Sequence, residues 1–246
     1  MNHDCSLVLR RLVLVWVCVA APAAFAGQWA GFLAAGTDNV YRGLSQGRGD
    51  ASWNGDIHWR SDGGWFAGLG LATVNLNSGP GAPLELAGYV GGSVTVAANF
   101  HGSLTVLHYE YPHDSRQLSY AYDEAIATIG YSDRIAMSVS YSPDTSRFSY
   151  RSIAKHRPAY SGELSAAVPL GRGWRANVGV GRYVISQPID GGYNYWNVGA
   201  DFAHGPWQFV ISAIGTDRSA KTLFGATITK TRCVATVIWR FRGSNR

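Results

Sequence analysis

Hydrophobic and polar residues alternate with a period of two along most of the chain. In 173–184, for example, Trp174, Val178 and Val180 share one face, while polar residues and glycines share the other. The same alternation runs through 231–241. Successive side chains of an extended chain point to opposite faces, so the pattern predicts β-strands that each have one apolar face.

Twelve segments of this kind are expected as strands. They are 28–37, 50–61, 64–75, 84–95, 99–109, 119–131, 134–142, 158–169, 173–184, 193–204, 206–217 and 231–241. Each has 9 to 13 residues, whereas a tilted strand needs roughly 9–11 residues to cross a bilayer. Strands of soluble proteins are typically about 5–6 residues long. The lengths therefore favour strands that span a membrane.

The connections between these segments alternate in length. The short ones are Ser61–Gly64, the stretch near Ala97 and Ala98, Ser132–Asp133, Gly171–Gly173 and His204–Pro206. The long ones are 38–49, 76–83, 110–118, 143–157, 185–192 and 218–230. Outer-membrane barrels have tight periplasmic turns and longer outer loops. We therefore expect an all-β fold, a single antiparallel up-and-down transmembrane β-barrel of about twelve strands.

The first residues differ from the rest of the chain. A basic pair, Arg10 and Arg11, precedes a short apolar run, and a small-x-small cleavage pattern ends at Ala26. This order is typical of a secretory signal peptide, and the run is shorter than the about 20 residues of a spanning helix. We expect a cleaved signal peptide at 1–26, a barrel at 27–246 and a location in the outer membrane.

The composition is rich in glycine and aromatic residues and poor in charge. The chain has 30 Gly, 9 Trp, 13 Tyr and 9 Phe, only 15% charged residues and a net charge of +5. No dense cluster of basic residues indicates a nucleic-acid site, so no nucleic-acid partner is expected. Removal of the signal peptide would leave Cys233 as the only cysteine, which excludes an intramolecular disulfide and a cysteine-based metal site. No cofactor is expected.

Several charged residues belong to the expected strands. A charge that faces lipid near the bilayer midplane costs about 2–4 kcal/mol, so we expect these side chains in the lumen. The candidates are Arg60, Arg175, Arg182, Arg232, Arg240, Asp56, Glu124 and Asp201. Two interpretations stay open: paired charges fill the interior, or an unpaired arginine-rich wall favours anions.

A few residues in or near the loops have side chains that could carry chemistry. They are Ser45, His108, Glu110, His113, Asp114 and His156. A nucleophilic serine needs a base within about 3 Å, and no hydrolase signature accompanies these residues. Their spacing also matches no standard zinc pattern. Hydrated loop residues are the favoured interpretation, so we expect no catalytic residue and no metal ligand.

One block in the first long loop resembles a known family. Residues 36–47 read Gly-Thr-Asp-Asn-Val-Tyr-Arg-Gly-Leu-Ser-Gln-Gly. The block resembles the opening signature of the TorF-type porin family of Gram-negative bacteria, roughly Thr-Ser-Asp-Tyr-x-Phe/Tyr-Arg-Gly-Ile/Leu-Ser-Gln. The matching residues are Thr37, Asp38, Tyr41, Arg42, Gly43, Leu44, Ser45 and Gln46. The resemblance implies an outer-membrane barrel of the porin kind, without established catalytic residues.

The block around Arg42 is expected to fold into the channel mouth or to brace the barrel wall. The favoured function is that of a porin, which lets small solutes diffuse passively and prefers anions if the lumen arginines are unpaired. Twelve strands lie between small filled barrels and wide 16–18-stranded porins. The alternative is therefore a filled barrel whose long outer loops have a structural, adhesive or receptor role. An enzyme acting at the rim of the barrel is a remote third interpretation.

The expected partners are outer-membrane lipid, the barrel-assembly machinery and small solutes. That machinery reads the aromatic residue on which outer-membrane barrels usually end. In this chain five residues follow Phe241, which departs from that pattern.

Overall fold

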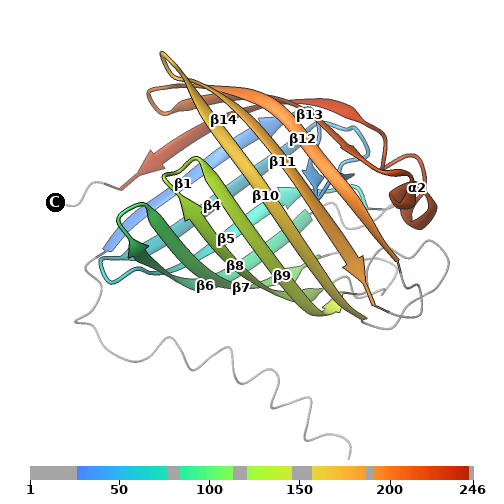
Figure 1. Ribbon diagram of the computed structural model, residues 1–246, viewed down its shortest axis with the longest axis horizontal. Helices are drawn as coiled ribbons and strands as arrows, with labels where there is room; N and C mark the ends of the chain where they lie inside the picture. The colour runs from blue at the N-terminus through green and yellow to red at the C-terminus, as the bar shows by residue number, and fades with distance from the viewer. Residues whose placement is uncertain (1–26, 77–83, 113–120, 146–156, 187–190, 244–246) are drawn as a thin grey trace, which may run out of the picture.

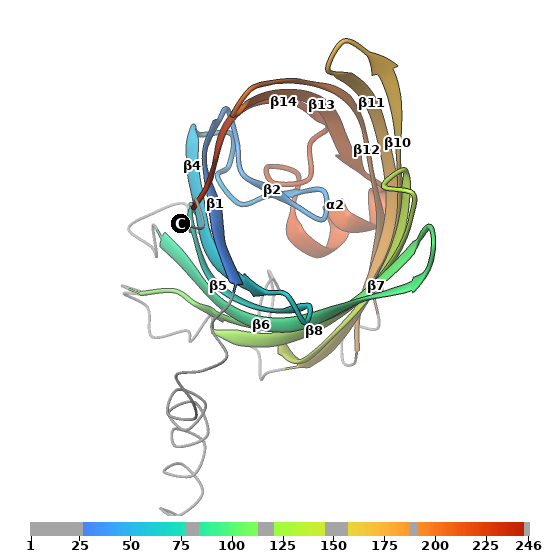
Figure 2. The same cartoon turned by 90° about the vertical axis from the view of Figure 1, so that its left-hand side faces the viewer.

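Twelve antiparallel strands form one closed barrel (Figures 1 and 2). The computed structural model describes residues 27–76, 84–112, 121–145, 157–186 and 191–243, so the predicted signal peptide, 1–26, lies outside the described residues. The wall strands are β1 (Gly27–Gly36), β4 (Ser52–Ser61), β5 (Trp65–Thr73), β6 (Leu84–Ala97), β7 (Phe100–Glu110), β8 (Tyr122–Tyr131), β9 (Ile135–Thr145), β10 (Arg157–Gly171), β11 (Trp174–Ile185), β12 (Gly191–His204), β13 (Trp207–Thr216) and β14 (Arg232–Arg242).

Each wall strand pairs with its neighbours along the chain, and the first strand closes the ring. β1 pairs with β4 on one side and with β14 on the other. The predicted fold class is thus confirmed, including the number of strands. The observed bounds differ from the expected ones by a few residues, because pairing with the neighbouring strand decides where each strand ends.

The outer surface of the barrel is apolar and its inner face is largely polar. In β4, Trp53 and Ile57 are 65% and 45% exposed on the outside, and Asp56 has the opposite parity. Trp53 lies at the end of β4 near the long connections, and Trp65 lies at the end of β5 near the short turns. Aromatic residues at both ends of an apolar band are typical of membrane barrels.

The short turns have the geometry that tight β-hairpins require. Ser132 and Asp133 join β8 to β9 with φ of 49° and 54°. Two consecutive residues with positive φ match the right-handed twist of the flanking strands. We call this side of the barrel the turn end and the opposite side the loop end.

Three further elements lie in the long connections and were not predicted as strands or helices. β2 (Val40–Tyr41) and β3 (Leu44–Ser45) pair as a small hairpin after β1. Helix α2 (Arg218–Phe224) follows β13. Within the described residues, no helix is long and apolar enough to span a membrane.

Candidate functional site

The connection between β1 and β4 folds back into the barrel. Its hairpin lies inside the ring of wall strands in the view along the barrel (Figure 2). Arg42 and Gly43 form the turn, with φ of 50° and 79°. A Cβ atom on Gly43 would lie 2.6 Å from Thr216 Cγ2 and 2.7 Å from Tyr195 Cβ, so glycine lets the hairpin tip approach the wall this closely.

Arg42 joins the tip of the hairpin to the wall across the lumen. Its Nη2 atom lies 2.5 Å from Glu124 Oε1 in β8 and donates to Ser140 Oγ in β9 at 2.9 Å. The guanidinium lies over the rings of Tyr41 and Tyr183, 4.6 and 5.2 Å from their centroids. The side chains of Glu124 and Arg42 are 1% and 10% exposed. Removing one partner of such a pair would leave a buried charge without compensation.

The protonation states of the tip residues support this arrangement. Desolvation is the largest of the effects that raise the pKa of Tyr41 well above its ordinary value. Desolvation acts to lower the pKa of Arg42, but the neighbouring Tyr41 and Glu124 outweigh it, and the pKa lies above its ordinary value. Tyr41 thus stays protonated, and its hydroxyl donates a hydrogen bond to Glu124 Oε2 at 2.9 Å, even though 36% of the residue's surface is accessible.

A second ion pair holds the base of the hairpin. Ser45 Oγ lies 2.9 and 2.8 Å from the two carboxylate oxygens of Asp38, which also binds Arg232 Nη1. Arg232 begins β14, so this pair ties the loop after the first strand to the last strand. Arg48 donates to the carbonyl oxygen of Asn75 at 3.0 Å and so ties the hairpin to the chain after β5.

Helix α2 is a second element that folds inward. It begins after Asp217, whose carboxylate accepts a hydrogen bond from Ala220 N at 3.2 Å. Ala220 and Phe224 are 0% and 8% exposed, and they pack with Leu44 of the hairpin in an apolar core. This core lies in the barrel mouth, where a simple pore would hold water.

The hairpin and the segment around α2 form one structure, because Ser45 N donates to Ile228 O at 2.9 Å. We call residues 37–51 and 217–231 together the plug. In the view along the barrel, both parts of the plug lie within the ring of strands (Figure 2). The plug occupies the loop end of the lumen.

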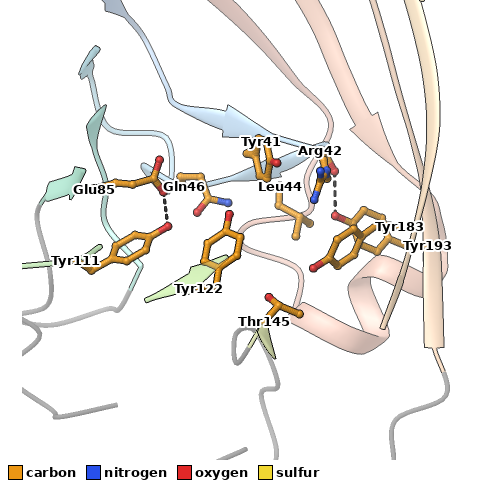
Figure 3. A pocket seen from close by; sticks show the side chains of 10 residues that line it. All are labelled: Tyr41, Arg42, Leu44, Gln46, Glu85, Tyr111, Tyr122, Thr145, Tyr183 and Tyr193. Atoms are coloured by element: carbon orange, nitrogen blue, oxygen red, sulfur yellow. Dashed lines mark hydrogen bonds between the residues drawn. The ribbon is translucent and has the colours of Figure 1, made fainter. Parts of the chain in front are cut away.

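A small cavity lies beside the plug among the described residues. A cavity of about 30 Å³ separates it from the wall, which is room for about two water molecules. Its lining residues are Tyr41, Arg42, Leu44, Gln46, Glu85, Tyr111, Tyr122, Thr145, Tyr183 and Tyr193 (Figure 3). Tyr193 donates its hydroxyl to Arg42 O at 3.0 Å, and Tyr111 donates to Glu85 (Figure 3).

The turn end of the lumen is open by comparison. A cavity of about 960 Å³ lies along β4 to β8. Several of its lining residues are polar or charged, and they include His58, Arg60, Ser93, Thr95 and His101. A volume of this size is at the upper end of the range of small-molecule sites, which is roughly 300–1,000 Å³.

At the turn end, the part of the wall formed by β11 to β14 carries a row of hydrogen-bonded polar side chains. Arg175 Nη2 lies 3.0 Å from Asp201 Oδ2, and Asn177 donates to Asp201 Oδ1 at 3.3 Å. Gln208 donates to Asp201 at 3.0 Å and accepts from Arg240. This row of side chains from β11 to β14 contains two arginines and one aspartate, so it carries a net positive charge.

Residues 21–241 match the profile of a sequence family described as "Bacterial protein of unknown function (Gcw_chp)". The chain belongs to this family. No curated protein matches it. The comparisons do not name the TorF-type family, so the resemblance of residues 36–47 to that family stays a prediction.

Two solved structures share the fold of this family member. The structure titled "KdgM porin" is 9% identical, with a TM-score of 0.53, and covers 86% of this chain and 99% of its own. The NanC porin structure is 7% identical, also with a TM-score of 0.53, and covers 87% of this chain and 98% of its own. At this identity the likeness concerns the fold alone.

The structure brings most of the predicted lumen residues together in pairs. Arg175 pairs with Asp201, and Arg232 and Glu124 pair with the plug residues Asp38 and Arg42. Asp56 accepts from Tyr89 OH at 2.7 Å and lies 2.7 Å from His58 Nδ1. Within the described residues, Arg60 and Arg240 have no acidic partner and contact Ser93 and Gln208.

The prediction that Arg182 faces the lumen is wrong. Its parity in β11 is that of the outward residues Val178 and Val180, and it is exposed. Its Nη1 atom donates to Asn194 Oδ1 at 3.1 Å on the neighbouring strand β12. It lies three residues before the end of β11 at Ile185, so it stands near the loop end and away from the midplane of the band.

The residues considered for chemistry are not gathered into one site. Ser45 lies in the plug, whereas His108 lies on the outward face of β7 with its Nδ1 atom 2.7 Å from Asp123. Glu110 is 3.6 Å from the other ring nitrogen of His108. His113, Asp114 and His156 lie outside the described residues. No group of three metal-binding side chains occurs in the described part of the chain.

Proposed function

We propose that this protein is an outer-membrane channel through which small hydrophilic solutes diffuse passively, and that the plug forms its narrowest point. The observation that carries the proposal is the cavity of about 960 Å³, lined in part by polar and charged side chains, inside a barrel whose outer surface is apolar. A barrel completely filled by side chains would leave no such space.

The apolar outer band supports a place in the membrane. Large side chains such as Leu69, Val94 and Leu104 are 65%, 62% and 57% exposed. Burying apolar surface in lipid stabilises by about 25 cal/mol per Å², and a closed barrel leaves no unpaired strand edge in the bilayer. The expected signal peptide and the fold shared with two porins support an outer-membrane location.

The charges of the lumen support only a modest preference for anions. In each of three arginine–carboxylate pairs, the two opposite charges neutralise each other. Arg60 and Arg240 remain near the turn end, where they add positive charge. Asp56 and Glu163 lie on the inner face and accept hydrogen bonds from tyrosine hydroxyls, so negative charge remains as well.

Conductance of the refolded mature chain in a planar lipid bilayer tests the proposal. We expect discrete single-channel steps and a reversal potential in a salt gradient that is shifted slightly toward anions. A folded, heat-modifiable barrel that shows no steps at any voltage would contradict the proposal.

A second function has one observation in its favour. The apolar core formed by Leu44, Ala220 and Phe224 fills part of the mouth, as expected of a filled barrel whose long outer loops have a structural, adhesive or receptor role. In that case the barrel would show no conductance until the plug is removed.

A further inference from the structure

We infer that the turn-end cavity is a binding subsite for a small hydrophilic anion with carboxylate or phosphate groups, so that the channel selects solutes by binding them. The inference rests on the proposed channel function for its role in transport. Three basic side chains are among the residues that line this cavity, namely His58, Arg60 and His101. They belong to only two strands, β4 and β7.

A neighbouring polar group contacts each of these side chains. Arg60 Nη2 donates to Ser93 Oγ at 2.6 Å, and His101 Nδ1 lies 3.4 Å from Thr95 Oγ1. The contact to Arg60 leaves most of the five N–H donors of its guanidinium for a ligand. Holding a side chain in its binding conformation in advance reduces the entropy lost on binding.

Asp56 fixes the orientation of His58, and Tyr89 in turn holds Asp56. Asp56 Oδ1 lies 2.7 Å from His58 Nδ1, and its other oxygen accepts from Tyr89 OH at 2.7 Å. The carboxylate thereby engages the Nδ1 side of the imidazole and leaves Nε2 for a ligand. The side chain of Asp56 is only 14% exposed, so it supports His58 from behind and does not line the cavity.

The spacing of these groups indicates the kind of anion. His58 and Arg60 are successive inward residues of one strand, which places their Cα atoms roughly 6.7 Å apart. One solute with two anionic groups can therefore contact both. Asp62 and Asp133 also line the cavity, but they come from the short turns at its edge, whereas His58, Arg60 and His101 lie within strands. The anion would therefore bind beside the strand residues, away from these two carboxylates.

Binding of inorganic pyrophosphate to the refolded barrel in detergent tests the inference by calorimetry. We expect saturable binding that Arg60→Gln weakens about 10-fold, because a hydrogen bond to a charged group is lost. His58→Gln is expected to weaken it less. Arg182→Gln is the matched control, since Arg182 lies on the outer face, and it should leave the affinity unchanged.

The same variants in a planar bilayer separate this inference from the proposed function. Pyrophosphate should reduce the ion current of the wild type at lower concentration than that of Arg60→Gln. Conductance steps without pyrophosphate binding would overturn the subsite and leave the channel. Binding without steps would overturn the channel and leave the subsite. Equal affinity in the wild type and in Arg60→Gln would also overturn the subsite.

Discussion

The loop end and the turn end of the lumen differ in how their inward-facing charged side chains are surrounded. At the loop end, the plug fills the space, and the charged residues Arg42 and Glu124 are buried against each other. At the turn end, Arg60 and His101 line an open cavity of about 960 Å³. Inward-facing charged side chains thus help to close one end of the barrel and line an open space at the other. Pairing and burial distinguish them.

Removing the hairpin should abolish this difference between the two ends and have the largest effect. Gly36 is paired with Ser52, so a two-residue Asn-Gly turn can replace residues 37–51 without moving the wall strands. We expect a severalfold rise in single-channel conductance, because the narrowest point is lost. The control is a chain with 37–51 intact and Gly205→Ala at a turn. Unchanged conductance in the shortened chain would show that residues 37–51 do not limit the current.

Breaking the ion pair at the hairpin tip should have the next largest effect. Arg42→Ala leaves the carboxylate of Glu124 buried without its cationic partner and should destabilise the plug by about 3–5 kcal/mol. Hydrogen exchange of the amides of 37–51 measures this loss, and current noise should rise with it. The double variant Arg42→Ala/Glu124→Ala removes the unpaired charge too and should recover part of the loss. Equal protection in all three proteins would contradict a bracing role for Arg42.

A methyl group at the hairpin tip should have a smaller effect on the plug. Gly43→Ala adds a Cβ atom within 3 Å of Thr216 and Tyr195 at a positive φ. Gly205→Ala also meets a positive φ but has no atom within 4 Å, so it should cost only about 1–2 kcal/mol of backbone strain. Thermal unfolding of the two variants compares them. If Gly43→Ala were as stable as Gly205→Ala, the close packing of the hairpin tip against the wall would not contribute to stability.

At the turn end, neutralising Arg60 and Arg240, which have no acidic partner among the described residues, should alter selectivity and leave the plug unchanged. The double variant Arg60→Gln/Arg240→Gln should move the reversal potential in a salt gradient toward cations, because Asp56 and Glu163 then dominate the charge. Arg182→Gln should leave the reversal potential unchanged, since that residue faces outward. A shift of equal size in both proteins would place the selectivity elsewhere.

The smallest effect is expected from acid at the start of α2. Hydrogen bonds from the backbone and side chain of Asn194 and from Ala220 N lower the pKa of Asp217 against an opposing desolvation effect. Because the pKa of Asp217 in the folded state lies below the unfolded-state pKa near 3.8, the ionised carboxylate stabilises the fold above that pH. This contribution is lost as the pH falls through the folded-state pKa. Hydrogen exchange of α2 between roughly pH 5 and pH 2 should show this loss in the wild type, and Asp217→Asn should not show it. The same loss in Asp217→Asn would assign it to another group.

The wall of the barrel was predictable from the sequence because its pattern is local. Alternation such as that of Trp174 and Val178 repeats within one strand, and every strand keeps one face toward the apolar outside. The wrong placement of Arg182 is instructive, since its parity in the strand places it with Val180 on the outer face. Charge alone was a poorer guide than parity, because a long side chain near a strand end can reach polar surroundings.

The plug was less predictable because its contacts are distant in sequence. Arg42 and Glu124 are 82 positions apart, and no local sequence pattern predicts that they pair. The block around Arg42 was expected to enter the mouth or brace the wall, and its hairpin does lie inside the ring. Helix α2 was missed, although Asp217 at its start and Gly225 after its end are ordinary capping residues. A seven-residue helix is too short for periodicity to reveal it.

The ion pair between Asp38 and Arg232 has a consequence for the order in which the molecule is completed. Asp38 follows the first strand and Arg232 opens the last, so their contact spans the seam where β1 meets β14. The two parts of the plug likewise follow β1 and precede β14. Nearly the whole chain must therefore be in place before these contacts can form, whereas the partner of Arg42, Glu124 in β8, is present much earlier. The contact between Asp38 and Arg232 thus reports that the ring has closed.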